Sequence, residues 1–455
     1  MRPSAFLASS LLFLRAFAFD NSRYDNVAVY WGQNSYGAGH SDTANFQKPI
    51  SFYCQDNAID VFPVAFLNVF FGPGGVPSIN LANTCNAVDN ATFPGTNLPN
   101  CASLASDIKA CQAKGKVVTL SLGGATGSVG FSSDDQATTF AQTIWNLFLG
   151  GSSSTRPFGD AVLDGVDLDI EGGSSDHYAA FVNKIRSLAN GASKKYYVTA
   201  APHSTQFTFY NNPCGLTHFG EAANWNFGIW DNWARTTSPN KNVKVYIGAP
   251  ASTSAAGSGY VSPDTLQSIA VQMRKSFPSF GGVMLWDASQ AYANGRYDLS
   301  IKNALVAAGG TGFTFPSCSA PAWAAGNNYP GNSQVSFGGY IWQSKWFSSS
   351  QPASNPNGDW SAISACSGSG STPPTTTTTT TAAPGSPTAG SCAGVAEWAR
   401  TTVYTGGMTA VYNNHLWTAN WWTQGDTPGG SSGAWKDNGA CTSTRRSVNS
   451  RVFKP

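Results

Sequence analysis

The stretch Leu163-Asp-Gly-Val-Asp-Leu-Asp-Ile-Glu-Gly-Gly173 decides how the large N-terminal part of this chain is interpreted. Within it, three acidic residues, Asp167, Asp169 and Glu171, alternate with apolar ones. Side chains along a strand point alternately to opposite faces, so the three carboxyl groups share one face. Because three carboxyl groups this close cannot all ionise cheaply, at least one pKa should be raised. The stretch therefore predicts a strand with a row of coupled carboxyl groups.

Comparable apolar and β-branched runs lie on both sides of this stretch, and helical patterns such as Tyr178–Leu188 separate most of them. With the run Gly165–Ile170 they number eight: Val27–Trp31, Val61–Phe71, Lys116–Leu122, Gly165–Ile170, Tyr197–Ala201, Phe207–Tyr210, Val243–Ile247 and Gly281–Trp286. Near-continuous apolar strands that alternate with helices indicate a parallel sheet. Residues 24–312 are therefore predicted to form an α/β fold, a (β/α)8 TIM barrel, whose usual size is about 250 residues.

In such a barrel the acidic row lines the interior, and Glu171 lies at the C-terminal mouth, where barrel enzymes place their chemistry. A carboxylic acid with a raised pKa can act there as a general acid. Two other interpretations are a solvated acidic face on an edge strand and a calcium site. Calcium takes about six to eight oxygen ligands, and few other acids lie nearby in the sequence. We expect neither a metal ion nor a cofactor.

One connection in the predicted barrel is too short. Only four residues separate Pro202 from Phe207, whereas a crossover between parallel strands needs about a dozen residues or more. The barrel is therefore expected to lack the helix after its fifth strand, unless the fifth and sixth strands do not pair as in a regular barrel.

The two ends of the chain differ from its interior. Residues 1–18 combine a basic start, a short apolar run and the sequence Ala16-Phe-Ala18, which is typical of a secretory signal peptide; a buried N-terminal helix is the alternative. Residues 367–391 are rich in Ser, Thr and Pro and predict an extended linker, and residues 442–455 form a basic tail. We expect a secreted, extracellular or cell-wall-associated protein.

Two small modules flank the linker, at residues 318–366 and 392–441. A shift of 75 residues superposes the following identities: Trp323 on Trp398, Tyr329 on Tyr404, Gly331 on Gly406, Trp342 on Trp417, Trp346 on Trp421, Trp360 on Trp435 and Cys366 on Cys441. Domains this small have marginal cores, so a disulfide should join the ends of each copy, Cys318 to Cys366 and Cys392 to Cys441.

Composition narrows the classes of partner. The 26 Lys and Arg nearly balance the 24 Asp and Glu, for a net charge of +2, so the basic footprint of a nucleic-acid-binding protein is missing. Beyond the N-terminus no apolar run approaches the roughly 20 residues of a membrane span. The nine Cys include no CxxC pair typical of zinc sites. Asn90-Ala-Thr92 is a sequon for N-glycosylation, and we expect a monomer.

At this point the chain resembles a known family. Asp164-Gly-Val-Asp-Leu-Asp-Ile-Glu171 matches the DxxDxDxE signature of glycoside hydrolase family 18, and Ser121-Leu-Gly-Gly124 matches its SxGG motif. Tyr30–Asn34, Phe209–Pro213 and Gly282–Trp286 are similar to the class III chitinases of plants and fungi. The resemblance spans residues 24–312 and implies a secreted endochitinase that hydrolyses β-1,4-linked N-acetylglucosamine.

The same resemblance implies the mechanism. Glu171 protonates the glycosidic oxygen and then activates water, while the 2-acetamido oxygen of the substrate attacks C1 with net retention, so that no second carboxylate nucleophile is needed. Further roles follow: Asp169 orients the acetamido group, Asp167 shares its charge, Tyr210 bonds the acetamido oxygen, Trp286 lies under the sugar, and Tyr30 and Gly124 line the site.

The resemblance also implies cis peptide bonds at Ala65–Phe66 and Trp286–Asp287. It implies the disulfides Cys54–Cys111 and Cys85–Cys101, which leaves Cys214 as the odd cysteine. The chain departs from the class III pattern at Thr208, where those enzymes carry Gln. This departure coincides with the short connection, and a wrongly assigned splice junction would explain both.

Residues Glu397–Cys441 resemble the chitin-binding modules of carbohydrate-binding families 5 and 12, and the 318–366 copy is a divergent relative. We expect exposed tryptophans to stack on sugars, and the candidates are Trp342, Trp346, Trp417, Trp421 and Trp422. Trp421 and Trp422 are adjacent in an expected strand, so one is core and one is a platform; the alternative is that every Trp is core. Two rival functions are a non-catalytic chitin-binding protein and an endo-β-N-acetylglucosaminidase acting on N-glycans.

Overall fold

The computed structural model describes residues 19–201, 214–367, 392, 395–404, 408–419, 423–430 and 433–441. The expected signal peptide, most of the linker and the basic tail lie outside these ranges, as does the expected sixth strand. The chain divides into two compact units, residues 1–373 and 374–455. The first small module therefore belongs to the same unit as the barrel.

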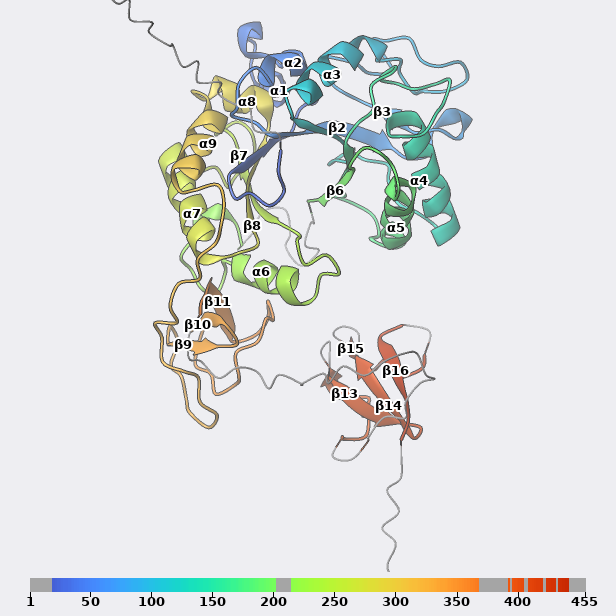
Figure 1. Cartoon of the computed structure of the whole chain (residues 1–455). Helices are drawn as coiled ribbons and strands as arrows, with labels where there is room; N and C mark the ends of the chain where they lie inside the picture. Colours follow the sequence, from blue (N-terminus) through green and yellow to red (C-terminus); the bar gives the residue numbers. More distant parts are fainter. Residues whose placement is uncertain are drawn as a thin grey trace, which may run out of the picture. The chain divides into compact units, whose positions relative to one another are not determined.

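A curled sheet of seven parallel strands organises the first unit (Figure 1). Its order is β6-β5-β4-β2-β1-β8-β7, and the strands are β1 (Asn26–Val29), β2 (Val61–Val69), β4 (Val117–Gly123), β5 (Gly165–Asp169), β6 (Tyr197–Ala200), β7 (Val245–Pro250) and β8 (Phe280–Trp286). A short strand that the sequence did not predict, β3 (Ser78–Ile79), pairs antiparallel with β2. Seven of the eight predicted strands are thus confirmed, and the α/β barrel architecture with them.

The described sheet ends at β6 on one side and at β7 on the other, because each pairs with a single neighbour. Thr199 and Ala200 of β6 are exposed, although strands of a parallel barrel are normally buried on both faces. The expected partner of β6, Phe207–Tyr210, lies outside the described residues. The β6 edge of the described sheet therefore coincides with the connection that the sequence marks as too short.

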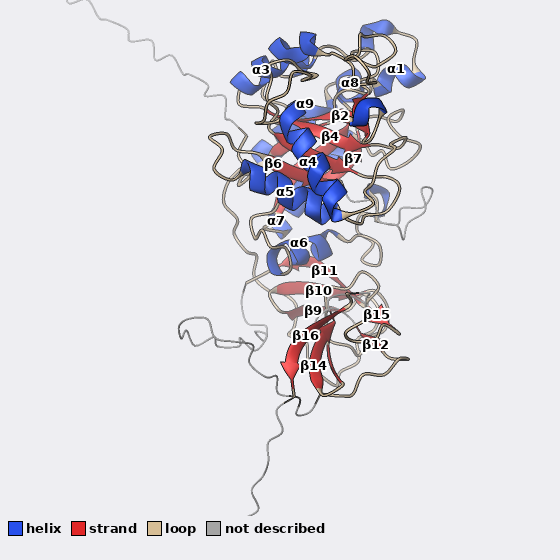
Figure 2. Ribbon diagram, turned by 90° about the vertical axis from the view of Figure 1, so that its right-hand side faces the viewer, coloured by secondary structure: helices blue, strands red, loops and turns tan. Residues whose placement is uncertain are grey.

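Helices cover the outer face of the sheet (Figure 2). The α-helices are α1 (Ser35–Gly39), α2 (Ile50–Tyr53), α3 (Ala105–Ala113), α4 (Asp134–Phe148), α5 (Tyr178–Ala189), α6 (Phe227–Thr236), α7 (Pro263–Ser276), α8 (Ala288–Ala293) and α9 (Tyr297–Ala307). Four short 3-10 turns are η1 (Thr43–Asn45), η2 (Pro73–Gly75), η3 (Ala102–Leu104) and η4 (Leu216–His218). Ser133 and Ser262 cap α4 and α7 through their side-chain oxygens, the usual role of serine before a first turn.

The two small modules repeat one three-stranded antiparallel sheet. The first contains β9 (Gln334–Phe337), β10 (Tyr340–Ser344) and β11 (Trp360–Ala365), and the second contains β13 (Thr409–Tyr412), β14 (His415–Ala419) and β16 (Trp435–Ala440). Every bound in the second sheet lies 75 residues after its counterpart, which is the shift that aligns the sequences. The second module adds β12 (Val403–Tyr404) and β15 (Thr423–Gln424).

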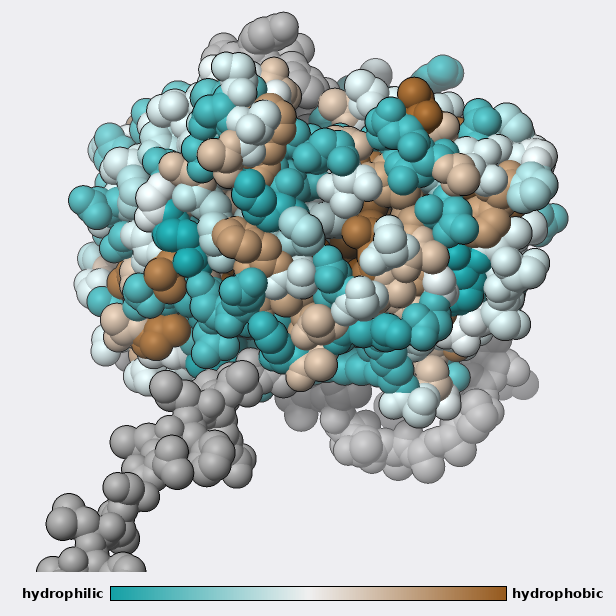
Figure 3. Space-filling model, turned by 90° about the horizontal axis from the view of Figure 1, so that it is seen from above, coloured by the Kyte–Doolittle hydropathy of each residue, from teal (hydrophilic) through white to brown (hydrophobic). Residues whose placement is uncertain are grey.

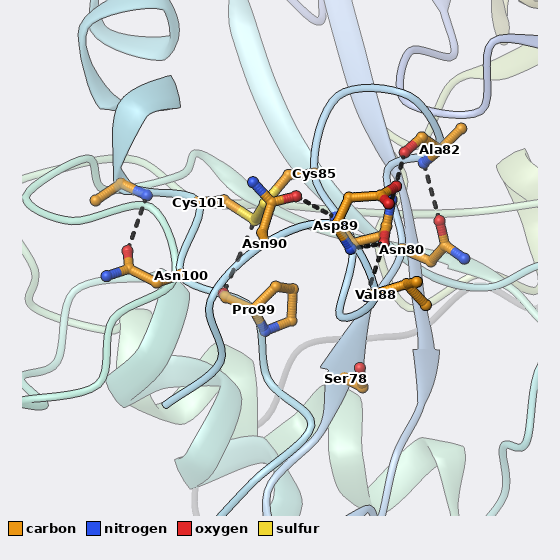
Figure 4. Close-up of a disulfide and its surroundings, with 12 residues drawn as sticks. Ser78, Asn80, Ala82, Cys85, Val88, Asp89, Asn90, Pro99, Asn100 and Cys101 are labelled. Atoms are coloured by element: carbon orange, nitrogen blue, oxygen red, sulfur yellow. Dashed lines mark hydrogen bonds between the residues drawn. A yellow bond between two sulfur atoms is a disulfide. The ribbon is translucent and has the colours of Figure 1, made fainter. Parts of the chain in front are cut away.

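All four expected disulfides are present: Cys54–Cys111, Cys85–Cys101, Cys318–Cys366 and Cys392–Cys441. Cys214 is half-buried and belongs to none of them. Figure 4 shows Asn90 beside the Cys85–Cys101 bridge, where its side-chain oxygen accepts from the backbone of Asn86. Its use as a glycosylation site stays a prediction.

On the face of the molecule shown in Figure 3, hydrophobic residues occur in small groups among hydrophilic ones. Within the described residues, no helix combines the length and the apolar character that crossing a bilayer requires.

Candidate functional site

The acidic row is anchored by Asp167, which is 3% exposed inside the curled sheet. Three hydroxyl groups donate to its carboxylate: Tyr30 and Ser121 to Oδ2, each at 2.7 Å, and Thr199 to Oδ1 at 2.5 Å. These donors come from the ends of β1 and β6 and from β4, so the sheet itself delivers them. Both carboxyl oxygens of Asp167 thus have hydroxyl partners within the protein, and these partners hold the side chain in one orientation.

Asp169, two residues further along β5, has the opposite environment. Burial, the negative charges of Glu171 and Asp167 and a side-chain hydrogen bond to Glu171 raise the pKa of Asp169 from 3.8 to about 8. At neutral pH Asp169 therefore carries a proton that it can donate to Glu171. The sequence predicted a raised pKa within the row, and the structure assigns it to Asp169.

Glu171 follows β5 and is half-buried, whereas Asp167 and Asp169 are buried. The row thus runs from a hydroxyl-bound carboxylate, through a protonated one, to a carboxyl group at the mouth. A carboxyl group in contact with both a buried proton and the exterior can exchange protons with a bound molecule. This arrangement is suited to general acid and base chemistry.

An aromatic cluster lies beside the row. The Tyr30 ring packs on Trp286 at 5.4 Å between centroids, and Phe66 stacks on Trp286 at 5.7 Å. Tyr30 is 3% exposed, whereas Trp286 is half-buried and keeps part of its surface available. The peptide bonds Ala65–Phe66 and Trp286–Asp287 are both cis, as expected.

Two consecutive glycines bring β4 close to this cluster. Gly123 and Gly124 have φ angles of +117° and +80°, which disfavour any side chain. A Cβ on Gly123 would collide with the carbonyl oxygen of Asp169, and one on Gly124 would lie 2.6 Å from the Phe66 ring. Gly124 also donates its backbone N–H to that same carbonyl, at 2.8 Å. The glycines are therefore needed for the close approach of β4 to the acidic row.

Gly123→Ala is expected to destabilise the protein by at least about 3 kcal/mol, because a strained φ and an overpacked contact add together. Gly130→Ala is the matched control, since Gly130 has a φ of +119° but no atom within 4 Å of the added Cβ. Its cost should stay near 1 to 2 kcal/mol. Urea denaturation of both variants tests this, and equal costs would mean that the contact with Asp169 is unimportant.

Tyr30→Phe removes one of the three donors to buried Asp167. Because hydrogen bonds to charged groups contribute about 1.5 to 3 kcal/mol, we expect a stability loss of that order. Tyr36→Phe removes a solvent-exposed bond to Asp42 and should lower stability much less than Tyr30→Phe. Urea midpoints of the two variants make the comparison. A Tyr30→Phe protein as stable as Tyr36→Phe would contradict the anchoring of Asp167.

The expected sugar-stacking tryptophans separate into different environments. Trp342 is 3% exposed, and its indole N–H donates to the carbonyl of Phe337, so it is a core residue and its expected role as a platform is wrong. Trp346 is 48% exposed. Trp417 is half-buried and donates to the carbonyl of Tyr412. Two further candidates, Trp421 and Trp422, lie outside the described residues.

Sequence reasoning missed Thr199 as a member of the site, and it marked Phe66 only as one end of an expected cis peptide bond. Thr199 contacts the row from β6, and Phe66 joins the aromatic cluster from β2. Only their position near the C-terminal ends of expected strands could have suggested them. Tyr210, expected at the site, lies outside the described residues. Among those described, no group of three or more His, Cys, Asp or Glu is arranged to hold a metal ion.

Two regions of the chain match known protein families. A family model described as "Glycosyl hydrolases family 18" matches residues 26–225, and one described as "Carbohydrate-binding module family 5/12" matches residues 397–436. A protein named "Chitinase 2" from Rhizopus oligosporus is 47% identical over 329 residues, 68% of this chain and 57% of that protein. A "Class III chitinase" from Arthroderma benhamiae is 40% identical over 313 residues, 62% of this chain and 86% of that protein.

The chain belongs to glycosyl hydrolase family 18. A crystal structure of a chitinase from Ipomoea carnea is 32% identical, with a TM-score of 0.47, over 61% of this chain and 99% of that one. The chain spans little more than half the length of the Rhizopus relative. The expected resemblance to fungal class III chitinases is confirmed, and in this family-18 member the carbohydrate-binding match covers the second small module.

Proposed function

We propose that the chain is a secreted endochitinase that hydrolyses the β-1,4 linkages of N-acetylglucosamine polymers. The observation that carries this proposal is the graded acidic row, in which Asp167 is held by hydroxyl groups and Asp169 keeps a proton beside Glu171. The fungal relatives named as chitinases favour chitin as the substrate. The site needs no cofactor for this reaction.

The reaction is proposed to proceed with retention through the substrate's own acetamido group. Glu171 donates a proton to the glycosidic oxygen while the acetamido oxygen attacks C1, and the glycosidic bond breaks. The proton that Glu171 gives up comes from Asp169, and the carboxylate left on Asp169 then accepts from the acetamido N–H and offsets the positive charge that forms on the oxazolinium ring. The oxygen of a water molecule then bonds to C1 as Glu171 takes a proton from it, the bond from C1 to the acetamido oxygen breaks, and the proton returns to the pair of Asp169 and Glu171.

Two neighbouring residues are assigned supporting roles. Trp286 offers a half-buried indole face beside the row, on which the sugar ring at the reacting position can stack. Tyr210 is proposed to bond the acetamido oxygen. Chitin is also the proposed ligand of the second small module, which a linker would keep near the substrate and so raise the local concentration of polymer.

Hydrolysis of soluble chitin oligosaccharides by the full chain tests the proposal. Release of shorter oligomers would support it. Release of glycans from an N-glycoprotein, with chitin oligomers left intact, would instead favour an endo-β-N-acetylglucosaminidase.

A non-catalytic chitin-binding protein is the second candidate, and the short connection after β6 favours it. If the barrel does not hold Tyr210 in place, the acidic row lacks its partner for the acetamido oxygen. Retention on chitin beads without hydrolysis of any oligomer would decide for this candidate.

A further inference from the structure

The two small modules differ in the burial of one face of their three-stranded sheet, the face by which the first module packs against the barrel. Tyr340 and Ala362 of the first module are 2% and 4% exposed. The residues 75 positions later are His415 and Asp437, whose side chains are 42% and 41% exposed and lie 2.9 Å apart. The same sheet thus carries a buried face in one copy and a polar, more exposed face in the other.

The buried face of the first module packs against helix α6 of the barrel (Figure 1). The Tyr340 hydroxyl donates to Asp231 at 2.7 Å. Asp231 is fully buried and also accepts from the backbone N–H of Ser279 at 2.9 Å. Arg235 donates to the Tyr340 hydroxyl at 2.8 Å. Because the buried carboxylate of Asp231 accepts hydrogen bonds from both the module and the barrel, it fixes the module in one position relative to the barrel.

The contact is also close in steric terms. A Cβ on Gly228 of α6 would collide with the carbonyl oxygen of Ala362, and Ser361 donates its hydroxyl to the carbonyl of Ala222. Trp342 and Trp360 belong to the same continuous hydrophobic core as the barrel strands. The first module is therefore a rigid part of the barrel unit.

Contacts at both ends of α6 determine which end of the module's sheet lies toward the mouth of the barrel. Asp231 meets Ser279, which immediately precedes β8, so the later turns of α6 lie at the N-terminal end of the strands. Ala222 precedes α6, and the chain of a (β/α) barrel enters each helix from the C-terminal ends of the strands, where the mouth is. Since Ser361 of β11 contacts Ala222, the Trp360 end of the module's sheet points to the mouth.

An exposed aromatic pair lies at that end. Ser344 pairs with Trp360 across the sheet, and the chain continues directly into Trp346 and Phe347, which are 48% and 62% exposed. The Trp346 indole N–H donates to Asp359 at 2.8 Å, and Lys345 Nζ lies 5.7 Å from the ring centroid, so the ring is held in place while about half of the residue stays exposed. Sugar rings stack on indole faces presented in this way.

We propose that the first module is a fixed extension of the substrate path, in which Trp346 and Phe347 hold a polymer chain of N-acetylglucosamine beyond the sugars at the acidic row. This inference rests on the proposed function for the identity of the polymer. It assigns the two modules different tasks: the first guides a chain into the mouth, and the second tethers the enzyme to chitin.

The test compares hydrolysis of soluble glycol chitin with that of N-acetylchitotriose by the full chain. The double variant Trp346→Ala/Phe347→Ala should lower kcat/KM on glycol chitin about three- to tenfold, the range expected for losing one aromatic stacking contact. Its rate on the trimer should not change. Trp233→Ala, which removes an exposed tryptophan of α6, is the matched control and should change neither rate.

A second variant tests the fixed position. Gly228→Ala forces the module away from α6 but leaves the aromatic pair intact, so glycol chitin hydrolysis should fall while trimer hydrolysis is retained. Wild-type rates on glycol chitin for the double variant would overturn the inference, even if Gly228→Ala does not fold. If the wild type cleaves neither substrate, the proposed function fails, and affinity electrophoresis in glycol chitin then tests the aromatic pair alone. Weaker retardation of the double variant than of the wild type would support the inference, and equal retardation would overturn it.

Discussion

Glu171→Gln is expected to lower the hydrolysis of chitin oligosaccharides by at least about 100-fold, because the amide can neither donate a proton to the leaving oxygen nor accept one from water. Gln keeps the size of the side chain and can still accept the hydrogen bond from Asp169. Binding and folding should therefore persist. Turnover of a soluble oligomer, followed by chromatography of the products, measures the effect.

Glu221→Gln is the matched control, since Glu221 lies on the surface of the same unit, where it pairs with His218. This variant should hydrolyse the oligomer at the wild-type rate. Retained activity in Glu171→Gln would show that another group donates the proton, and the assignment of the general acid would be wrong.

Asp169→Asn is expected to lower activity by about 100-fold, the order seen when one preorganised polar group is removed, and at the same time to stabilise the fold at alkaline pH. The pKa of Asp169 is about 8 in the folded protein against an ordinary 3.8. Between these values the folded state holds a proton that the unfolded chain has released. Stability should therefore be highest below about pH 4 and fall as the pH rises towards 8.

The size of the stability gain follows from this shift. Each pKa unit corresponds to about 1.4 kcal/mol, so the full shift would give about 6 kcal/mol. Because three coupled carboxyl groups share this free-energy cost of ionisation, we expect Asp169→Asn to raise the free energy of unfolding by about 2 to 3 kcal/mol at pH 8 and by little at pH 4. Urea denaturation at both pH values measures the difference.

Asp135→Asn is the control, because Asp135 is an exposed residue in the first turn of α4. Its stability should differ from that of the wild type by less than about 1 kcal/mol at either pH. A pH-independent effect of Asp169→Asn would contradict the raised pKa and, with it, the proton between Asp169 and Glu171.

The arrangement of the acidic row can be predicted from the sequence because two kinds of pattern coincide there. Alternation places Asp167, Asp169 and Glu171 on one face, and the neighbouring apolar residues require the other face to be buried. The repeat of tryptophans and cysteines likewise predicts both small modules and the disulfide that joins the ends of each. Local patterns of this kind need no knowledge of distant partners.

Partners supplied by other strands are harder to predict. Which hydroxyl groups meet Asp167 depends on the registers of β4 and β6, and the proton on Asp169 depends on the burial that these strands create. The expectation for Trp342 failed for a related reason. An indole in a small module can either lie in the core or form an exposed platform for a sugar ring. In the first module, packing against α6 determines which of these applies to Trp342.

The central claim is that the acidic row of this chain, with its short connection after β6, cleaves chitin through the substrate's acetamido group. Proton NMR of a chitin oligosaccharide during its first turnovers by the full chain tests this claim most directly. Retention predicts that the β-anomer of the new reducing end appears first and then equilibrates. Initial release of the α-anomer, or an unchanged oligomer, would contradict the account.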